Sequence, residues 1–251
     1  MEKGANPKPD IIQNQCFGCG NCVIACPENA IGLQSHNYFY KADIDHEKCT
    51  SCGTCIPACW CGALQQPGAT DKIILDKINS YGNEILKAHG SGSDPGVLAF
   101  VCNFYQSALG EDFESKIYNQ PSDGILIKIT CIAQIKPEYI SKALGYGFDG
   151  VLIIGCCNNG CTFTSAAERA IKRFTIFCRL LDHLGLDSKR ISLNHNVPCN
   201  SSDLLTVFEE FKDQLKQRGP NPLKTEIVEN YFSGPQFRQK KGYSISGGQM
   251  Q

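Results

Sequence analysis

Cysteines are the residues of this sequence with the clearest chemical potential, and there are 16 of them among 251 residues. Eight form two runs with the spacing C-x2-C-x2-C-x3-C. The first run is Cys16, Cys19, Cys22 and Cys26, and the second is Cys49, Cys52, Cys55 and Cys59. Thiolates at this spacing are typical ligands of [4Fe–4S] clusters, because such a loop can wrap round one cubane. Both runs therefore predict metal binding.

Two other uses of clustered cysteines fit the chain less well. Disulfide frameworks belong mainly to short secreted proteins, whereas the first residues, MEKGANPKPD, are polar and lack the apolar region of an export signal. Zinc is typically held by pairs of C-x2-C rather than by complete four-cysteine runs. The net charge of −1 and the absence of a membrane-length apolar run favour neither nucleic acid nor membrane binding. We therefore expect a reducing, cytoplasmic location.

Residues 11–62 resemble the two-cluster ferredoxins of bacteria at all eight cysteines of the runs. The resemblance implies an α+β ferredoxin-like module with two [4Fe–4S] clusters, in which the fourth cysteine of each run ligates the other cluster. One ligand set would be Cys16, Cys19, Cys22 and Cys59, and the other would be Cys49, Cys52, Cys55 and Cys26. The second run lacks the proline that follows Cys26. Cys61 could compete with Cys59 there, although Cys59 keeps the spacing.

The segments beside the runs carry weaker patterns. Residues 30–44 predict a short hairpin with three aromatic residues over the clusters. These are Tyr38, Phe39 and Tyr40. Residues 63–96 form a predicted linker, in which residues 71–89 show near-helical spacing of apolar side chains. An amphipathic helix packed on one module is the favoured interpretation, and a partner-binding helix is the alternative. The sequence GSGSDPG (90–96) predicts a flexible joint.

Residues 97–217 alternate short β-rich runs with helical patterns. This alternation predicts an α/β domain with a mostly parallel, open, flavodoxin-like sheet. The predicted strands are 97–102, 125–131, 151–156 and 191–197, and the predicted helices are 138–144, 165–184 and 202–215. Cys102, Cys131 and Cys156 each end a strand, and Cys161 precedes a helix. Because ligand sites form outside the carboxyl ends of parallel strands, these four are expected to converge, which suits a [2Fe–2S] cluster. Buried cysteines that simply end core strands are the alternative.

The same segment resembles the delta subunit of methyl-viologen-reducing (F420-non-reducing) hydrogenase. The resemblance rests on AFVCNF, ITCIAQIKPE, GVLIIGCCNNGCTF and the basic helix ERAIKRFTIFCRLLDHLGL. It implies a [2Fe–2S] cluster on Cys102, Cys131, Cys156 and Cys161. Cys157 or Cys199 could replace one of these ligands, and Cys178 is expected to pack in the core. The family relays electrons from a hydrogenase or formate dehydrogenase to the flavin subunit of heterodisulfide reductase.

No catalytic constellation is visible, and the loop after the first strand lacks a G-x-G-x-x-G fingerprint. We therefore expect no independent active site but a single-electron relay with three clusters. Its partners would be a flavin-containing heterodisulfide reductase A-like subunit and a hydrogenase, formate dehydrogenase or other redox subunit. The alternatives are the electron-input subunit of a related anaerobic reductase complex, in aromatic acyl-CoA or sulfur metabolism, and a redox-sensing assembly protein. Residues 218–251 are expected to form an extended tail.

Overall fold

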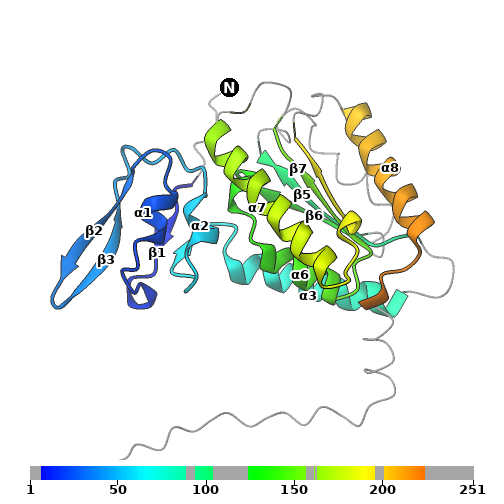
Figure 1. The fold of residues 1–251 in the computed structure, drawn as a ribbon, viewed down its shortest axis with the longest axis horizontal. Coiled ribbons are helices and arrows are strands. Elements are labelled where there is room, and N and C mark those ends of the chain that lie inside the picture. Colours follow the sequence, from blue (N-terminus) through cyan, green and yellow to red (C-terminus); the bar gives the residue numbers. More distant parts are fainter. Residues whose placement is uncertain are drawn as a thin grey trace, which may run out of the picture.

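The computed structural model describes residues 7–88, 94–103, 124–156, 161, 163–195 and 201–223. A small cysteine-rich module (residues 7–66) lies at one end of the molecule, and a larger sheet domain (residues 71–223) forms the rest (Figure 1). No helix of these residues combines the length and the apolar character needed to cross a bilayer. The predicted tail falls outside the described residues from residue 224 onward.

Short elements build the cysteine-rich module. They are β1 (Asp10–Ile11), the 3-10 turn η1 (Gln13–Gln15), α1 (Asn21–Ala25), β2 (Ile31–His36), β3 (Phe39–Ile44), α2 (Cys55–Ala58) and β4 (Leu64–Gln65). β1 pairs antiparallel with β4, and this pairing joins the two ends of the module. β2 and β3 form an antiparallel hairpin.

The two cysteine runs repeat the same backbone conformations. Gly20 and Gly53 occupy equivalent positions and have φ angles of 77° and 75°, and Gly18 and Ser51 have φ angles of 66° and 64°. At Gly18 the chain also approaches the hairpin closely, since an added Cβ would lie 2.0 Å from the carbonyl oxygen of Tyr40. Only glycine combines this conformation with this contact. The matching conformations identify the module as an internal repeat.

The hairpin aromatics do not cover the interior of the module, so this expectation was wrong. Tyr38, Phe39 and Tyr40 are 97%, 72% and 62% exposed. Of β2, only Ile31 is buried, because the far half of the hairpin extends beyond the body of the module (Figure 1). The core of the module is instead made at the base of the hairpin, where Ile31, Ala42 and Ile44 pack together.

A four-stranded parallel sheet forms the centre of the larger domain, as the alternating pattern predicts. Its strands are β5 (Val97–Cys102), β6 (Gly124–Ile129), β7 (Gly150–Ile154) and β8 (Ile191–Asn194), in the spatial order β6-β5-β7-β8. β5 and β7 are buried along their whole length, which explains their unbroken apolar sequences. The chain passes from β5 to β6 on one side and then crosses to β7 on the other. This reversal between β5 and β7 is a switch point, the usual ligand site of such sheets.

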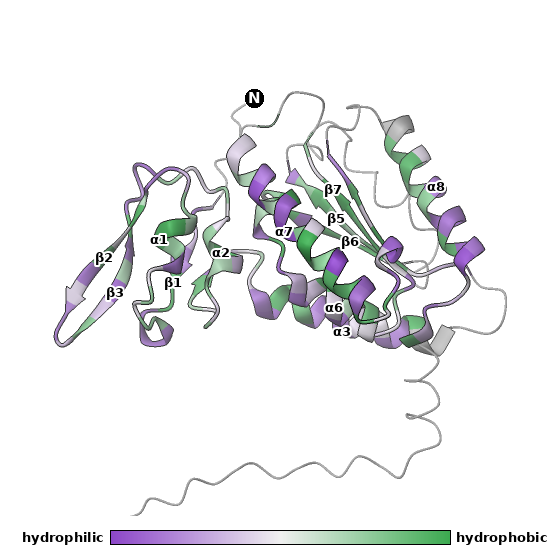
Figure 2. Ribbon diagram, in the orientation of Figure 1, coloured by the Kyte–Doolittle hydropathy of each residue, from purple (hydrophilic) through white to green (hydrophobic). Residues whose placement is uncertain are grey.

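Helices cover both faces of this sheet (Figure 1). α3 (Asp71–Ala88), α6 (Pro137–Gly145) and α7 (Thr164–His183) share one buried cluster with the strands, and α8 (Ser201–Arg218) shares another with the opposite face. Figure 2 shows apolar strands between helices that also carry hydrophilic residues. Two 3-10 turns complete the described elements. They are η3 (Ile132–Gln134) and η4 (Ser188–Arg190).

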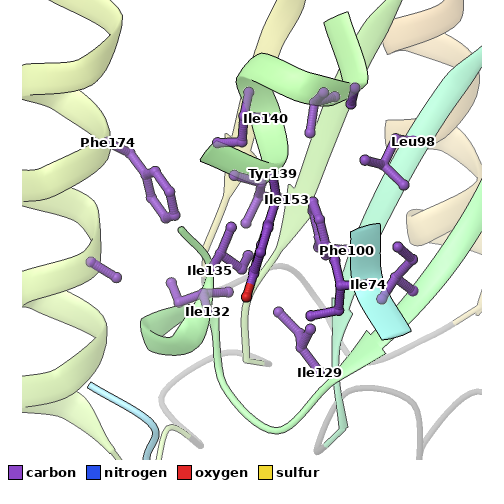
Figure 3. Packing of buried hydrophobic residues seen from close by; sticks show 14 of the residues in the cluster. Ile74, Leu98, Phe100, Ile129, Ile132, Ile135, Tyr139, Ile140, Ile153 and Phe174 are labelled. Atoms are coloured by element: carbon purple, nitrogen blue, oxygen red, sulfur yellow. The ribbon is translucent and has the colours of Figure 1, made fainter. Parts of the chain in front are cut away.

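Aromatic rings fill the first of these buried clusters. Figure 3 shows Phe174 of α7 and Tyr139 of α6 extending into it, with Phe100 of β5 beside the tyrosine ring. The ring centroids of Phe100 and Tyr139 lie 6.3 Å apart. Their packing fixes α6 and α7 against the sheet and so fixes the turns at its carboxyl edge.

α3, which lies between the two cysteine-bearing segments in the sequence, packs against the sheet domain. Ile74, Ile78 and Ile85 on its inner face are at most 1% exposed, whereas Ile73 is 40% exposed. Gly82 allows close contact with α6, since an added Cβ would lie 2.6 Å from the Cβ of Tyr146. The helix therefore contributes directly to the first buried cluster of the sheet domain.

A polar contact centred on Asp71 joins the module to the sheet domain. The Asp71 carboxylate accepts hydrogen bonds from Gln65 of β4 (2.9 Å), from Lys136 (2.6 Å) and from the hydroxyl of Tyr139. Burial raises the pKa of Asp71, but the hydrogen bonds from Lys136, Tyr139 and Gln65 outweigh burial and hold the pKa below its ordinary value. The first residue of α3 thus anchors both parts of the protein.

Replacing Asp71 with asparagine should destabilise the protein by about 2 kcal/mol, or roughly 4–8 °C in thermal midpoint. The reason is that Lys136, 8% exposed, would lose its counter-charge. The matched control is Asp76→Asn, which removes the exposed partner of Lys72 and should leave the midpoint nearly unchanged. Thermal melts of the anaerobic protein measure both, and equal midpoints for the two variants would contradict the prediction.

The contribution of Asp71 should also depend on pH. A carboxyl group with a depressed folded-state pKa stabilises fully above its unfolded-state pKa, near 4, and this stabilisation is lost as the pH falls through the folded-state value. The difference in midpoint between the wild type and Asp71→Asn should therefore be constant above about pH 5 and shrink in more acidic buffer.

Candidate iron–sulfur sites

The cysteines of the two runs line two separate pockets, and each pocket takes thiols from both runs. One pocket is lined by Cys26, Cys49, Cys52 and Cys55. The other is lined by Cys16, Cys19, Cys22 and Cys59. These are the two crossed sets that the ferredoxin resemblance implies. Isoleucine, leucine and proline side chains contribute to the walls of the pockets.

Electrostatic interactions group the thiols in the same way. The pKa of Cys22 is raised to about 11, first by burial and then by the charges of three thiols of its own pocket. The pKa of Cys55 is raised by burial and then chiefly by the charges of the three other thiols of its own pocket, Cys52, Cys49 and Cys26. Thiols that repel one another's charge in this way become thiolates when a bound cation compensates them. Both pockets therefore suit a metal centre.

Backbone amides complete the surroundings of the sulfur atoms. The Ala30 amide donates to Sγ of Cys26 (3.3 Å), and the Ala42 amide donates to Sγ of Cys16 (3.4 Å). Within the described residues, no three His, Cys, Asp or Glu side chains are arranged round a single metal ion. The thiols instead surround pockets. Four thiols and amide donors round an apolar pocket fit the chemistry of a [4Fe–4S] cluster.

The thiols of the sheet domain meet at its carboxyl edge. Cys102 ends β5 and Cys156 follows β7, and their Sγ atoms lie 3.5 Å apart at the switch point. Cys131 follows β6 and caps the turn η3, where its Sγ accepts a hydrogen bond from the Ala133 amide (3.5 Å). The three cysteines are at most 3% exposed. Residues far apart in the sequence are thus brought together by the parallel sheet.

Cys161 joins this group from the segment before α7. It is half-buried and contacts both buried clusters of the sheet domain. Burial, and then the charges of Cys102 and Cys161, raise the pKa of Cys131 to about 12. The pKa of Cys156 is raised by its hydrogen bond with Cys102, by burial and by the charge of Cys161. All four predicted thiols therefore interact at one site.

The remaining cysteines fall into three groups. Cys61 lines the same pocket as Cys59, and their Sγ atoms lie 3.6 Å apart, so both sulfurs reach this pocket. Cys157 and Cys199 lie outside the described residues. Cys178 is half-buried in α7. The fourteen cysteines of the described residues are thiols rather than disulfides.

One thiol of the module, Cys52, interacts with a thiol of the sheet domain, Cys131, across the boundary between these parts. Cys52 belongs to the same buried cluster as Cys131, and its charge contributes to the raised pKa of Cys131. Beside it, Gly53 packs on the turn η3, where an added Cβ would lie 2.8 Å from the Cβ of Gln134. The loop that carries Cys52 therefore rests directly on the turn that carries Cys131.

Arg169 of α7 bonds across this boundary, and Arg173 of the same helix holds the turn η3 beside it. The sequence patterns indicated neither residue. Arg169 donates from Nη1 to the last two carbonyls of α1, at 3.3 and 3.0 Å. Arg173 donates from Nη2 to the carbonyls of Ala133 (2.9 Å) and Ile135 (3.1 Å). The available signal was the place of Arg173 beside Phe174 on the apolar stripe of the helix, where a charged residue is unusual.

Comparisons with known proteins identify both parts of the chain. Residues 15–63 match the 4Fe-4S dicluster domain family, and residues 97–219 match the family of the methyl-viologen-reducing hydrogenase delta subunit. The A-type subunit of the ferredoxin:CoB-CoM heterodisulfide reductase of Methanosarcina mazei is 34% identical over 217 residues, which is 86% of this chain. The chain spans about a quarter of the length of that relative, 26%.

Two shorter relatives match about half of this chain. The D-type iron-sulfur subunit of the F420-non-reducing hydrogenase of Archaeoglobus profundus is 26% identical over 127 residues, which cover 51% of this chain and 93% of the relative. The corresponding vhu iron-sulfur subunit of Methanococcus maripaludis is 28% identical over 134 residues, 53% of this chain and 98% of the relative. The chain therefore joins a 4Fe-4S dicluster domain to a domain of the methyl-viologen-reducing hydrogenase delta-subunit family.

Proposed function

We propose that the chain relays single electrons between a redox partner, such as a hydrogenase or formate dehydrogenase, and the flavin subunit of a heterodisulfide reductase-like complex in a reducing cytoplasm. Three ligand sets would hold its clusters. They are Cys16, Cys19, Cys22 and Cys59 for one [4Fe–4S] cluster, Cys49, Cys52, Cys55 and Cys26 for the other, and Cys102, Cys131, Cys156 and Cys161 for a [2Fe–2S] cluster. Each bound cluster exchanges one electron, at a potential that depends on nearby charge, hydrogen bonds and exposure.

The observation that carries this proposal is the contact between the Cys52 loop and the Cys131 turn. Both thiols belong to one continuous apolar cluster, and Gly53 against Gln134 allows the two backbones to approach closely. Electron exchange becomes rapidly slower with distance, so a relay needs its sites side by side. The pocket lined by Cys16 shares no residue with this contact and would form the outer end of the relay.

The names of the relatives support the proposed partners. The protein from M. mazei is named as an A-type subunit of a ferredoxin-dependent heterodisulfide reductase, and those from A. profundus and M. maripaludis are named as hydrogenase subunits. The match to the M. mazei protein runs over 217 residues and so through both domains. A protein that carries this pair of domains is suited to a place between a hydrogenase-type donor and an A-type subunit.

Low-temperature EPR of the anaerobically purified, stepwise-reduced chain, with iron measured on the same sample, tests the cluster content. We expect about ten irons per chain, one [2Fe–2S] signal and two interacting [4Fe–4S] signals. About eight irons without a [2Fe–2S] signal would show that the sheet domain is a docking or substrate domain without a cluster. Bound flavin, released on denaturation and detected by its fluorescence, would favour a catalytic role for that domain instead.

Electron transfer to a partner needs a separate measurement. The chain, reduced with dithionite and freed of excess reductant, should be mixed with an oxidised, flavin-containing A-type subunit of heterodisulfide reductase. Rapid reoxidation of the clusters with simultaneous flavin reduction is expected. Clusters that stay reduced in such a mixture, while partner affinity changes with oxidation state, would favour the redox-sensing alternative.

A further inference from the structure

We propose that Arg173 is a positioning residue for the [2Fe–2S] cluster: its guanidinium group fixes the turn that carries Cys131 and supplies a permanent positive charge beside the cluster. The inference rests on the proposed function, because it requires a cluster on the thiols of the sheet domain. It adds a residue that lies outside all three ligand sets and that controls the potential of one cluster.

Two hydrogen bonds connect Arg173 to the turn that carries Cys131. Its Nη2 atom donates to the carbonyls of Ala133 and Ile135, which follow Cys131 in and after η3. The Ala133 amide in turn donates to Sγ of Cys131. Arg173 therefore holds the same short turn that presents a hydrogen bond to the ligand sulfur, and it does so from α7, a separate rigid element.

The charge of Arg173 has no carboxylate partner among the described residues. Its Nε atom is buried without a hydrogen-bond acceptor there, and its guanidinium carbon lies 5.4 Å from the centre of the Phe174 ring. Burial lowers the pKa of Arg173 to about 10, and the charge of Cys131 opposes this shift. Even a partly buried cation without a counter-ion is costly. The thiolate of Cys131, as the ligand of a negatively charged cluster, would supply the missing counter-charge.

A fixed cation beside a cluster has a predictable effect on its redox chemistry. Reduction adds one negative charge, and a positive charge in a poorly solvated site stabilises this added charge more than it would in water. Arg173 therefore raises the reduction potential of the [2Fe–2S] cluster. Compared with a chain that lacks this charge, electron transfer from the cluster on the Cys52 side of the boundary to the [2Fe–2S] cluster on the Cys131 side is more favourable.

An EPR-monitored redox titration of the full chain tests this inference with matched variants. Arg173→Gln removes the charge, Arg173→Lys keeps it, and Lys172→Gln removes a more exposed charge at the neighbouring position of α7. We expect Arg173→Gln to shift the [2Fe–2S] midpoint potential downward, with both [4Fe–4S] midpoints nearly unchanged. Arg173→Lys should retain most of the wild-type potential, and Lys172→Gln should retain all of it.

Several outcomes would overturn the inference. A shift in Arg173→Gln that is no larger than the shift in Lys172→Gln would show that the charge does not act on the cluster. If the [2Fe–2S] signal is lost from both Arg173→Gln and Arg173→Lys, Arg173 has a purely structural role. Loss of the [2Fe–2S] signal from Arg173→Gln alone would support the inference, because Arg173→Lys keeps the positive charge. Absence of the [2Fe–2S] signal from the wild type would instead overturn the proposed cluster itself, before any variant is compared.

Discussion

Replacing Cys131 with alanine should abolish the [2Fe–2S] EPR signal and lower the iron content from about ten to about eight per chain. Cys131 is 1% exposed and is held in place by the turn η3, by the Ala133 amide and, through that turn, by Arg173. No neighbouring thiol among the described residues is available for this position, because Cys102, Cys156 and Cys161 are assigned to the same cluster and Cys52 is assigned to a [4Fe–4S] cluster. The remaining three thiols would leave one iron without its fourth ligand.

The [4Fe–4S] signals should survive in this variant. Their ligands lie in pockets lined by residues of the cysteine-rich module alone. Cys178→Ala is the matched control, since it makes the same chemical change in a half-buried cysteine of α7 and should keep all three signals. If the [2Fe–2S] signal persists in Cys131→Ala, then Cys157 or Cys199 acts as a ligand, and the double variants would show which one.

The candidate ligands could be predicted from the sequence because each depends on a short-range pattern. The crossed sets of the module are those implied by the resemblance of the two runs to bacterial ferredoxins, and the structure brings Cys59 to the pocket of the first run and Cys26 to that of the second. In the sheet domain, apolar strands that end in cysteine are sufficient to predict that the thiols converge. Parallel strands place their carboxyl ends on one edge, so Cys102 and Cys156 meet although 54 residues separate them.

The boundary between the two parts could not be predicted, because its residues carry no local pattern. Gly53 appears in the sequence as a loop glycine, yet its lack of a side chain also leaves room for the close approach of Gln134. Asp71 begins a helix, as acidic residues often do, and only the tertiary structure shows that it binds Lys136 and Gln65. The prediction that the aromatic residues of the hairpin cover the clusters was wrong for a related reason. Hydrophobic side chains such as Phe39 need not be buried when a strand extends past its core.

Removing iron should unfold residues 7–66 while the sheet domain stays folded. The core of the module is small, and two of its seven buried members are the thiols Cys22 and Cys55. So short a segment buries too little apolar surface to be stable alone, and metal binding and folding should therefore be coupled. The sheet domain instead has two clusters of buried apolar residues from strands and helices, and these do not need iron to pack.

Hydrogen exchange of the full chain before and after anaerobic treatment with an iron chelator measures this difference. We expect amides of β2, β3 and β4 to lose protection, while amides of β5 and β7 keep it, because these strands are buried along their whole length. Adding iron and sulfide back should restore protection to the module. A module that stays protected without iron would show that its contacts through Asp71, Gly53 and Arg169 are sufficient to hold it folded. Loss of protection in both parts at once would show that the boundary makes them a single cooperative unit.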